Sequence, residues 1–126
     1  METACAHGKV LVIDDEPHLR DLIKDVLEPE GYQVFCAANG ADGNALNKQK
    51  DPDVIILDLR MPGMDGIETL RNIRTSDKQV RIVILTGYAS PDTIREAADL
   101  NASEYLSKPF ENDDLVSVIA NACQLK

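Results

Sequence analysis

Acidic, hydroxyl and basic side chains follow four short apolar runs that lie far apart in this chain. The adjacent pair Asp14 and Asp15 follows the first run, and Asp58, Thr86 and Lys108 follow three later ones, at successive separations of 43, 28 and 22 positions. In a parallel α/β sheet, ligands bind in the crevice outside the carboxyl ends of the strands, so residues at those ends converge in space. Three carboxylates, a hydroxyl and an ammonium in one crevice predict a site for a metal ion and a phosphoryl group.

These side chains have the chemistry that phosphoryl transfer needs. Asp14 and Asp15 are adjacent, so a persisting strand pleat points them apart, which favours one direct metal ligand whose neighbour holds a water. Hard oxygen ligands suit Mg²⁺, which prefers one or two carboxylates plus a phosphate oxygen. Asp58 is the candidate nucleophile, since carboxylates form acyl-phosphate intermediates. Mg²⁺ and Lys108 would each hold a phosphoryl oxygen, and the Thr86 hydroxyl would bond a third.

Strand-like apolar runs alternate with helix-period segments from end to end, which is typical of βαβ units around a parallel sheet. Strands are predicted over residues 9–13, 33–37, 53–58, 81–85 and 103–106, and helices around 19–27, over 41–49, around 67–73, over 91–100 and from 112 onward. The run 53–58 is apolar on both faces and should lie in the middle of the sheet. Residues 60–66 are predicted to form a turn-rich loop.

Three local features refine the predicted helices. The first helix should place Leu19, Leu22, Ile23, Val26 and Leu27 on one apolar stripe. The segment 41–49 contains several residues of poor helix propensity and would need tertiary packing to hold it. Ser90 is the predicted N-cap of the fourth helix, and Asn101 is predicted to close that helix in the left-handed conformation.

Length and composition limit the classes of function. The 126 residues predict one domain, too short to carry a separate effector domain beside it. The longest apolar runs have four residues, whereas a membrane helix needs about 20. Residues 1–8 lack a signal-peptide pattern, so we expect a soluble, cytoplasmic protein. A net charge of -9 argues against direct nucleic-acid binding, which needs a basic surface, and three widely spaced cysteines fit neither a disulfide framework nor a zinc site.

Four motifs carry a resemblance to a known family. They are Val-Ile-Asp-Asp-Glu from Val12, Ile-Ile-Leu-Asp-Leu-Arg-Met-Pro-Gly-Met-Asp-Gly from Ile55, Leu-Thr-Gly-Tyr-Ala from Leu85, and Tyr-Leu-Ser-Lys-Pro-Phe from Tyr105. With them the chain resembles the receiver domain of two-component response regulators, of the chemotaxis-regulator type. The resemblance implies a flavodoxin-like fold with a five-stranded parallel sheet of order 2-1-3-4-5 and helices on both faces. It also implies that residues 9–126 form the receiver domain and that residues 1–8 are an N-terminal extension.

The resemblance implies a phosphoacceptor site with a bound metal ion. Asp58 would accept a phosphoryl group from the histidine of a sensor kinase or of a histidine phosphotransfer protein. Asp15, Asp58 and the backbone carbonyl of Arg60 would bind Mg²⁺, with help from Asp14. The chain would thus be a signalling domain in a phosphorelay, with no nucleic-acid or membrane partner of its own.

The resemblance further implies a conformational switch. Thr86 and Lys108 would bind the phosphoryl group, and Thr86 would move toward it while Tyr105 turns inward to fill the vacated space. The face made by the fourth helix, the fifth strand and the fifth helix would then control an output protein or domain. Lys108-Pro109 would be a cis peptide bond, which aims the ammonium into the site.

Each of these residues also has a purely structural interpretation. Asp15 and Asp58 could be helix N-caps, Thr86 a turn residue, Lys108 a solvated lysine, and Tyr105 a packing residue on an edge strand. The conjunction of a metal-ligand pair, a nucleophile, a hydroxyl and a cation at successive strand ends favours the functional interpretation.

Two other functions compete with the phosphoacceptor. A Mg²⁺-dependent phosphatase with an aspartyl nucleophile, of the haloacid-dehalogenase type, would place a second Asp two residues after the nucleophile, where this chain has Arg60. A pseudo-receiver that works without phosphorylation would lack Asp58, Asp15 or Lys108, and all three are present. We therefore expect a phosphoacceptor with slow self-dephosphorylation, and no enzymatic turnover of an outside substrate.

Overall fold

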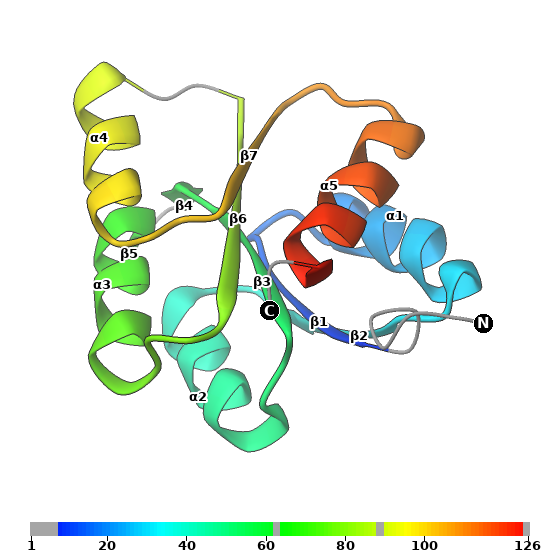
Figure 1. Ribbon diagram of the computed structural model, residues 1–126, viewed down its shortest axis with the longest axis horizontal. Helices are drawn as coiled ribbons and strands as arrows, with labels where there is room; N and C mark the ends of the chain where they lie inside the picture. Colours follow the sequence, from blue (N-terminus) through cyan, green and yellow to red (C-terminus); the bar gives the residue numbers. More distant parts are fainter. Residues whose placement is uncertain (1–7, 62–63, 88–89, 125–126) are drawn as a thin grey trace.

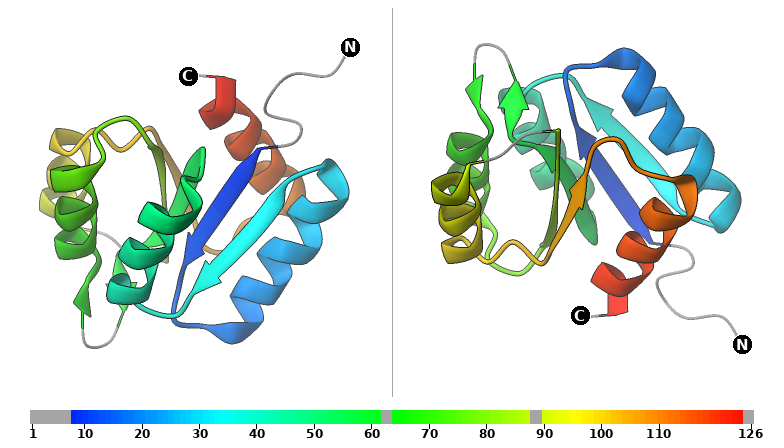
Figure 2. Two further views of the ribbon diagram at one scale, coloured as in Figure 1. Left: turned by 90° about the horizontal axis from the view of Figure 1, so that it is seen from below. Right: turned by 90° about the horizontal axis from the view of Figure 1, so that it is seen from above.

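A five-stranded parallel sheet forms the centre of the molecule (Figures 1 and 2). The computed structural model describes residues 8–61, 64–87 and 90–124. The strands are β1 (Lys9–Ile13), β2 (Gln33–Ala37), β3 (Val54–Asp58), β6 (Arg81–Thr86) and β7 (Glu104–Ser107), in the order β2-β1-β3-β6-β7. Counted along the chain, this is the order 2-1-3-4-5 of a flavodoxin-like fold, so the predicted class and the central place of β3 are confirmed.

Five helices cover the two faces of the sheet. They are α1 (Pro17–Leu27), α2 (Gly40–Lys50), α3 (Gly66–Ser76), α4 (Pro91–Asp99) and α5 (Asn112–Gln124). Alternate residues of the central strands face opposite layers, as strand geometry requires: Val10 and Val12 of β1 pack in the core with α1 and α5, whereas Leu11 and Ile13 pack in the core with α2, α3 and α4. The views in Figure 2 show the same division into layers.

Helix α2 forms in spite of its poor intrinsic propensity because capping and packing hold it. The Asn39 side chain accepts a hydrogen bond from the Asp42 N–H at 2.8 Å and caps the first turn. Gly43 lies directly against the side chain of Ile13, so a Cβ at this position would collide with the core of the sheet. Asn47 is buried as well. The glycine that weakens the helix is therefore the residue that lets it approach β1.

Other local predictions are confirmed. The Ser90 hydroxyl accepts a hydrogen bond from the Thr93 N–H at 3.2 Å and caps α4, and Asn101 has the left-handed φ of 64°. After α1, a short 3-10 helix, η2 (Glu28–Glu30), leads to Gly31, whose φ of 100° suits glycine alone among common residues.

Two predictions need correction. Residues 60–66 are not only a loop, because β4 (Arg60–Met61) pairs antiparallel with β5 (Met64–Asp65). Leu22 belongs to the stripe predicted to face the core, but it is 40% exposed, because it lines a surface pocket beside Pro109 and Phe110 and does not reach the sheet. None of the helices in the described parts of the chain is long and apolar enough to cross a membrane. The predicted extension falls, except for Gly8, outside the described residues, and its boundary stays a prediction.

Candidate functional site

All four predicted strand-end positions meet at one edge of the sheet. Strands β1 and β3 run in parallel with Ile13 opposite Leu57, so Asp14 leaves β1 beside the final residue of β3, Asp58. Thr86 is itself the last residue of β6, one residue later than the predicted end of that strand, and it pairs in register with Ser107 of β7. Lys108 follows directly. The topology thus brings together side chains that are far apart in the sequence.

Three carboxylates form an acidic cluster at this edge. Asp14, Asp15 and Asp58 each offer an oxygen, and these oxygens lie within 4.8 Å of one another. Asp14 and Asp58 are buried, whereas Asp15 is half-buried. An acidic cluster of this size can hold a metal ion, because hard carboxylate oxygens are the ligands that hard cations prefer.

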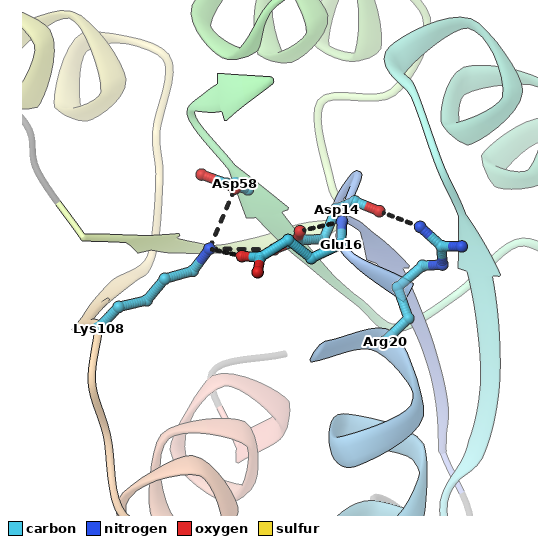
Figure 3. Close-up of polar contacts among 5 residues, drawn as sticks. All are labelled: Asp14, Glu16, Arg20, Asp58 and Lys108. Atoms are coloured by element: carbon cyan, nitrogen blue, oxygen red, sulfur yellow. Dashed lines mark hydrogen bonds and ion pairs between the residues drawn. The ribbon is translucent and has the colours of Figure 1, made fainter. Parts of the chain in front are cut away.

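The ammonium of Lys108 bridges two of these carboxylates (Figure 3). It donates to Asp58 Oδ2 at 3.1 Å and to Asp14 Oδ2 at 3.3 Å. The Lys108 backbone N–H donates to the Thr86 carbonyl at 3.0 Å, which ties the base of the lysine to the end of β6. The Lys108-Pro109 peptide bond is cis, as the resemblance implies. The lysine therefore points into the acidic cluster and not into solvent.

The pKa values of Asp14 and Lys108 are both raised, but for different reasons. Burial raises the pKa of Asp14 above its ordinary value, and repulsion from Asp58 adds to the shift, while the Glu16 backbone N–H and Lys108 partly oppose it. Burial by itself lowers the pKa of Lys108, but attraction to Asp14 and Asp58 outweighs it, and the pKa of the ammonium is raised. Lys108 is therefore a permanent cation at neutral pH.

Two residues that we did not single out in the sequence complete the loop after β1. The Glu16 N–H donates to Asp14 Oδ1 at 2.9 Å, and Glu16 Oε1 lies 3.6 Å from Lys108 Nζ. The Arg20 guanidinium, from the first turns of α1, donates to the Asp14 carbonyl at 2.7 Å (Figure 3). Glu16 directly follows the acidic pair, so the sequence could have suggested that it lies at the site. Arg20 bonds a backbone carbonyl, and no sequence pattern indicates such a contact.

Tyr105 lies apart from the acidic cluster, beside a small pocket on the α4 side of the sheet. The pocket has a volume of about 160 Å³ and is lined by Ile84, Thr86, Gly87, Ile94, Tyr105, Leu106 and Ser107. Tyr105 is 39% exposed, and its hydroxyl donates to the Ile94 carbonyl of α4 at 3.3 Å. Thr86 and Tyr105 thus border the same hollow from two neighbouring strands.

Comparison with known proteins agrees with this geometry. The family model described as the response regulator receiver domain matches residues 10–120. The chain belongs to this family. Sporulation initiation phosphotransferase F of Bacillus subtilis is 37% identical over 118 residues, which are 94% of this chain and 95% of that protein. Regulatory protein AtoC of Escherichia coli is 34% identical over 121 residues, which are 96% of this chain but 26% of that protein.

Solved structures give the same result for the receiver domain. Chemotaxis protein CheY4 of Vibrio cholerae superposes with a TM-score of 0.86 at 32% identity, covering 91% of this chain and 98% of that one. A CheY-like receiver domain protein of Methanospirillum hungatei superposes with a TM-score of 0.90 at 28% identity, covering 94% of each chain. The receiver domain therefore has a phosphoacceptor signalling role in a two-component system.

Family and site together decide between the competing functions. The domain is a signalling module and not a classical enzyme, and neither the phosphatase nor the pseudo-receiver is favoured. Receiver domains interact with kinases and with output domains. Arg60 opens β4 two residues after Asp58, and the role predicted for its carbonyl as a metal ligand stays a prediction.

Proposed function

We propose that Asp58 accepts a phosphoryl group from a phosphohistidine, with Mg²⁺ bound in the cluster of Asp14, Asp15 and Asp58. The observation that carries the proposal is the Lys108 ammonium, held 3.1 Å from Asp58 Oδ2 at the edge of the three-carboxylate cluster. A cation in contact with the acceptor oxygen neutralises charge where a phosphoryl group would arrive. The domain would work in the cytoplasm, as receiver domains typically do.

The proposed transfer is a single displacement at phosphorus. A bond forms between a carboxylate oxygen of Asp58 and phosphorus, and the bond between phosphorus and the donor imidazole nitrogen breaks, with its electron pair staying on that nitrogen. Asp58 is buried, so it is held in place and shielded from competing water. Lys108, which is charged at neutral pH, is released from Asp58 Oδ2 to pair with a phosphoryl oxygen. The Thr86 hydroxyl, on the neighbouring strand, would bond another.

The donor set suits Mg²⁺. Three carboxylates and one ammonium leave a formal charge of -2, which one divalent cation cancels. Asp14, Asp15 and Asp58 would hold the ion together with the Arg60 carbonyl, and the ion when bound would neutralise charge on the transferring phosphoryl group. The Glu16 N–H and Arg20 fix the side chain and the carbonyl of Asp14, so the acidic loop is preorganised for this task.

The output would be a conformation of the face made by α4, β7 and α5. A phosphoryl group adds a charge of roughly -1.5 to -2 and new acceptor oxygens, which draw the Thr86 hydroxyl toward Asp58. The hollow of about 160 Å³ beside Thr86 offers room for the outward-facing Tyr105 ring to turn inward. That turn would break its hydrogen bond to the Ile94 carbonyl and free the start of α4 to move.

The partners would be a sensor histidine kinase or a histidine phosphotransfer protein on the input side and an unidentified protein or domain on the output side. Support comes from two relatives: one of nearly equal length is named a sporulation initiation phosphotransferase, and the other is a regulatory protein of which this chain matches about a quarter. Self-dephosphorylation would be slow, without turnover of outside phosphate esters.

Intact mass spectrometry tests the acceptor. Wild type, Asp58→Asn and the surface control Asp25→Asn are incubated with MgCl₂ and acetyl phosphate, with and without EDTA. We expect one phosphoryl adduct on wild type and on the control, and none on Asp58→Asn or in EDTA. Rapid phosphate release from many esters would replace the proposal with a phosphatase, and the absence of any wild-type adduct would replace it with a pseudo-receiver.

Amide hydrogen exchange tests the output face. Exchange is compared before and after adding MgCl₂ and beryllofluoride, a phosphoryl mimic. Residues 90–107, which contain α4 and β7, should change their protection from exchange. Helix α2 should not, because it packs against β1 and β2, on the side of the sheet far from β7. Unchanged exchange over α4 and β7 would contradict the switch while leaving the acceptor role intact.

A further inference from the structure

Glu16 places a fourth carboxylate at the mouth of the site, outside the three-carboxylate cluster. Its Oε1 atom lies 3.6 Å from Lys108 Nζ, and the same nitrogen lies 3.1 Å from Asp58 Oδ2. The Glu16 side chain is 63% exposed, whereas that of Lys108 is 21% exposed. Figure 3 shows Glu16 reaching from the loop after β1 to the ammonium. A donor that reaches Asp58 Oδ2 therefore comes close to this exposed negative charge.

Hydrogen bonds hold the backbone of Glu16 on both sides. Its N–H is bonded to Asp14 Oδ1 at 2.9 Å, and its carbonyl accepts the Arg20 N–H at 3.1 Å as α1 begins. Its own φ of -90° and ψ of 113° are extended, followed by Pro17 at the first helical position. The Arg20 guanidinium bonds the Asp14 carbonyl and closes the loop from the other side. The carboxylate thus projects from a backbone that is hydrogen-bonded on both sides.

Stability does not explain the position of this carboxylate. Lys108 already has two buried carboxylate partners, Asp14 and Asp58, and its raised pKa comes from those two. An ion pair with a side chain as exposed as Glu16 adds little to folding stability. With Glu16, four carboxylates surround or approach one ammonium, and the carboxylate of Glu16 is the exposed one that faces solvent.

We propose that Glu16 is a specificity-determining residue that selects phosphoryl donors by charge; this inference rests on Asp58 being the phosphoacceptor. The two distances to Lys108 Nζ share one atom, so Glu16 Oε1 and Asp58 Oδ2 lie no more than about 7 Å apart, inside the ~10 Å Debye length at 0.1 M salt. A small donor that is close to a dianion is repelled on its way to Asp58. A donor whose negative charge is offset by a cationic group is repelled less. Glu16 thereby limits phosphorylation by small anionic acyl phosphates.

The test compares two small donors on variants at two positions. Acetyl phosphate is close to a dianion near neutral pH, whereas phosphoramidate carries a cationic nitrogen that offsets part of its charge. Rates of adduct formation are measured at saturating Mg²⁺ for wild type, Glu16→Gln and Glu16→Lys. Asp25→Asn and Asp25→Lys are the matched controls, because Asp25 is an exposed carboxylate of α1 with the same change in net charge.

At low ionic strength Glu16→Gln should speed the reaction with acetyl phosphate about fivefold, and Glu16→Lys should speed it further. The gain with phosphoramidate should be about twofold or less, and both gains should shrink toward none at about 0.5 M salt. The Asp25 variants should match wild type. Thermal unfolding should be nearly the same for all five proteins, since both positions are exposed.

Three results would overturn the inference: no acceleration in the Glu16 variants, equal acceleration in the Asp25 variants, or the same gain for both donors. None of these would touch the proposed function, because the adduct would still form on Asp58. Failure of the proposed function is a different result, namely an adduct that persists in Asp58→Asn or never forms in wild type.

Discussion

Replacing Asp14 by Asn should stabilise the metal-free domain, although it removes an ion pair with Lys108. Asp14 is buried among two other carboxylates and one ammonium. The Asn side chain keeps an oxygen in the place of Oδ1, so it can still accept the Glu16 N–H. The substitution therefore removes a negative charge and leaves the backbone hydrogen bond in place.

The size of the effect follows from the distances. Asp14 has one ammonium at 3.3 Å and two carboxylates whose oxygens lie within 4.8 Å. At an effective dielectric near 20, the attraction at 3.3 Å is worth about 5 kcal/mol and each repulsion at 4.8 Å about 3.5 kcal/mol, so two repulsions against one attraction leave Asp14 unfavourable by about 2 kcal/mol before relaxation and water reduce it. We expect a gain of about 1–2 kcal/mol in the free energy of unfolding, or roughly 5 °C in Tm.

The same site gives the effect a pH dependence with a definite sign. Burial, with added repulsion from Asp58, raises the pKa of Asp14, so the folded state holds this proton more tightly than the unfolded chain does. The metal-free wild type therefore loses stability as the pH rises from the ordinary value of 3.8 through the raised pKa, and Asp14→Asn escapes this loss. The advantage of the variant should be small in acid and largest at neutral pH.

Thermal unfolding in EDTA across this pH range measures the difference, with Asp25→Asn as the control for net charge. Adding MgCl₂ should stabilise wild type more than Asp14→Asn, because a bound cation removes the repulsion that the variant lacks. A lower Tm for Asp14→Asn than for wild type in EDTA at neutral pH would refute the reasoning. Equal stabilisation of both proteins by Mg²⁺ would refute the part of Asp14 in metal binding.

Two further predictions concern the fold. Arg74 is buried, and its guanidinium donates to four backbone carbonyls at 2.8 to 3.3 Å, so Arg74→Gln should lower the free energy of unfolding, measured in urea, by about 2–4 kcal/mol. The control Arg71→Gln, at an exposed position, should lower it by less than about 0.5 kcal/mol. Losses of similar size in the two variants would contradict this prediction. A Cβ at Gly66 would collide with the backbone of Leu59, so Gly66→Ala should lower the free energy of unfolding by more than about 2 kcal/mol. The atom nearest to a Cβ at Gly87 would be 3.7 Å away, so Gly87→Ala should change this free energy by less than about 0.5 kcal/mol. Equal tolerance of both alanines would show that α3 can shift away from Leu59.

The positions of the site residues were predictable because sheet topology alone determines them. Four apolar runs in a parallel sheet place whatever follows them at one edge, and Asp58, Thr86 and Lys108 follow such runs. The orientation of the side chains was not predictable in this way. That Lys108 bridges Asp14 and Asp58, and that Glu16 reaches the same nitrogen, depends on loop backbones whose hydrogen bonds are set by tertiary contacts.

The fold shows the same limit in its short elements. The pair β4 and β5 has two residues in each strand, too few for an apolar alternation to reveal. Helix α2 was predicted in spite of Gly43, but only the contact with Ile13 explains why a glycine stands there. Leu22 was placed in the core because helical periodicity reports which residues share a face, and not how far the neighbouring layer extends over it.

The most direct test of the central claim locates the phosphoryl group on the chain. The domain is phosphorylated with acetyl phosphate and MgCl₂, the acyl phosphate is reduced with borohydride to an alcohol, and the digested protein is mapped by tandem mass spectrometry. We expect a single aspartate, Asp58, to be converted to homoserine, and no conversion when the phosphodonor is left out. Conversion at Asp14 or Asp15, or at no aspartate in a protein whose intact mass shows the adduct, would contradict the assignment of Asp58 as the phosphoacceptor.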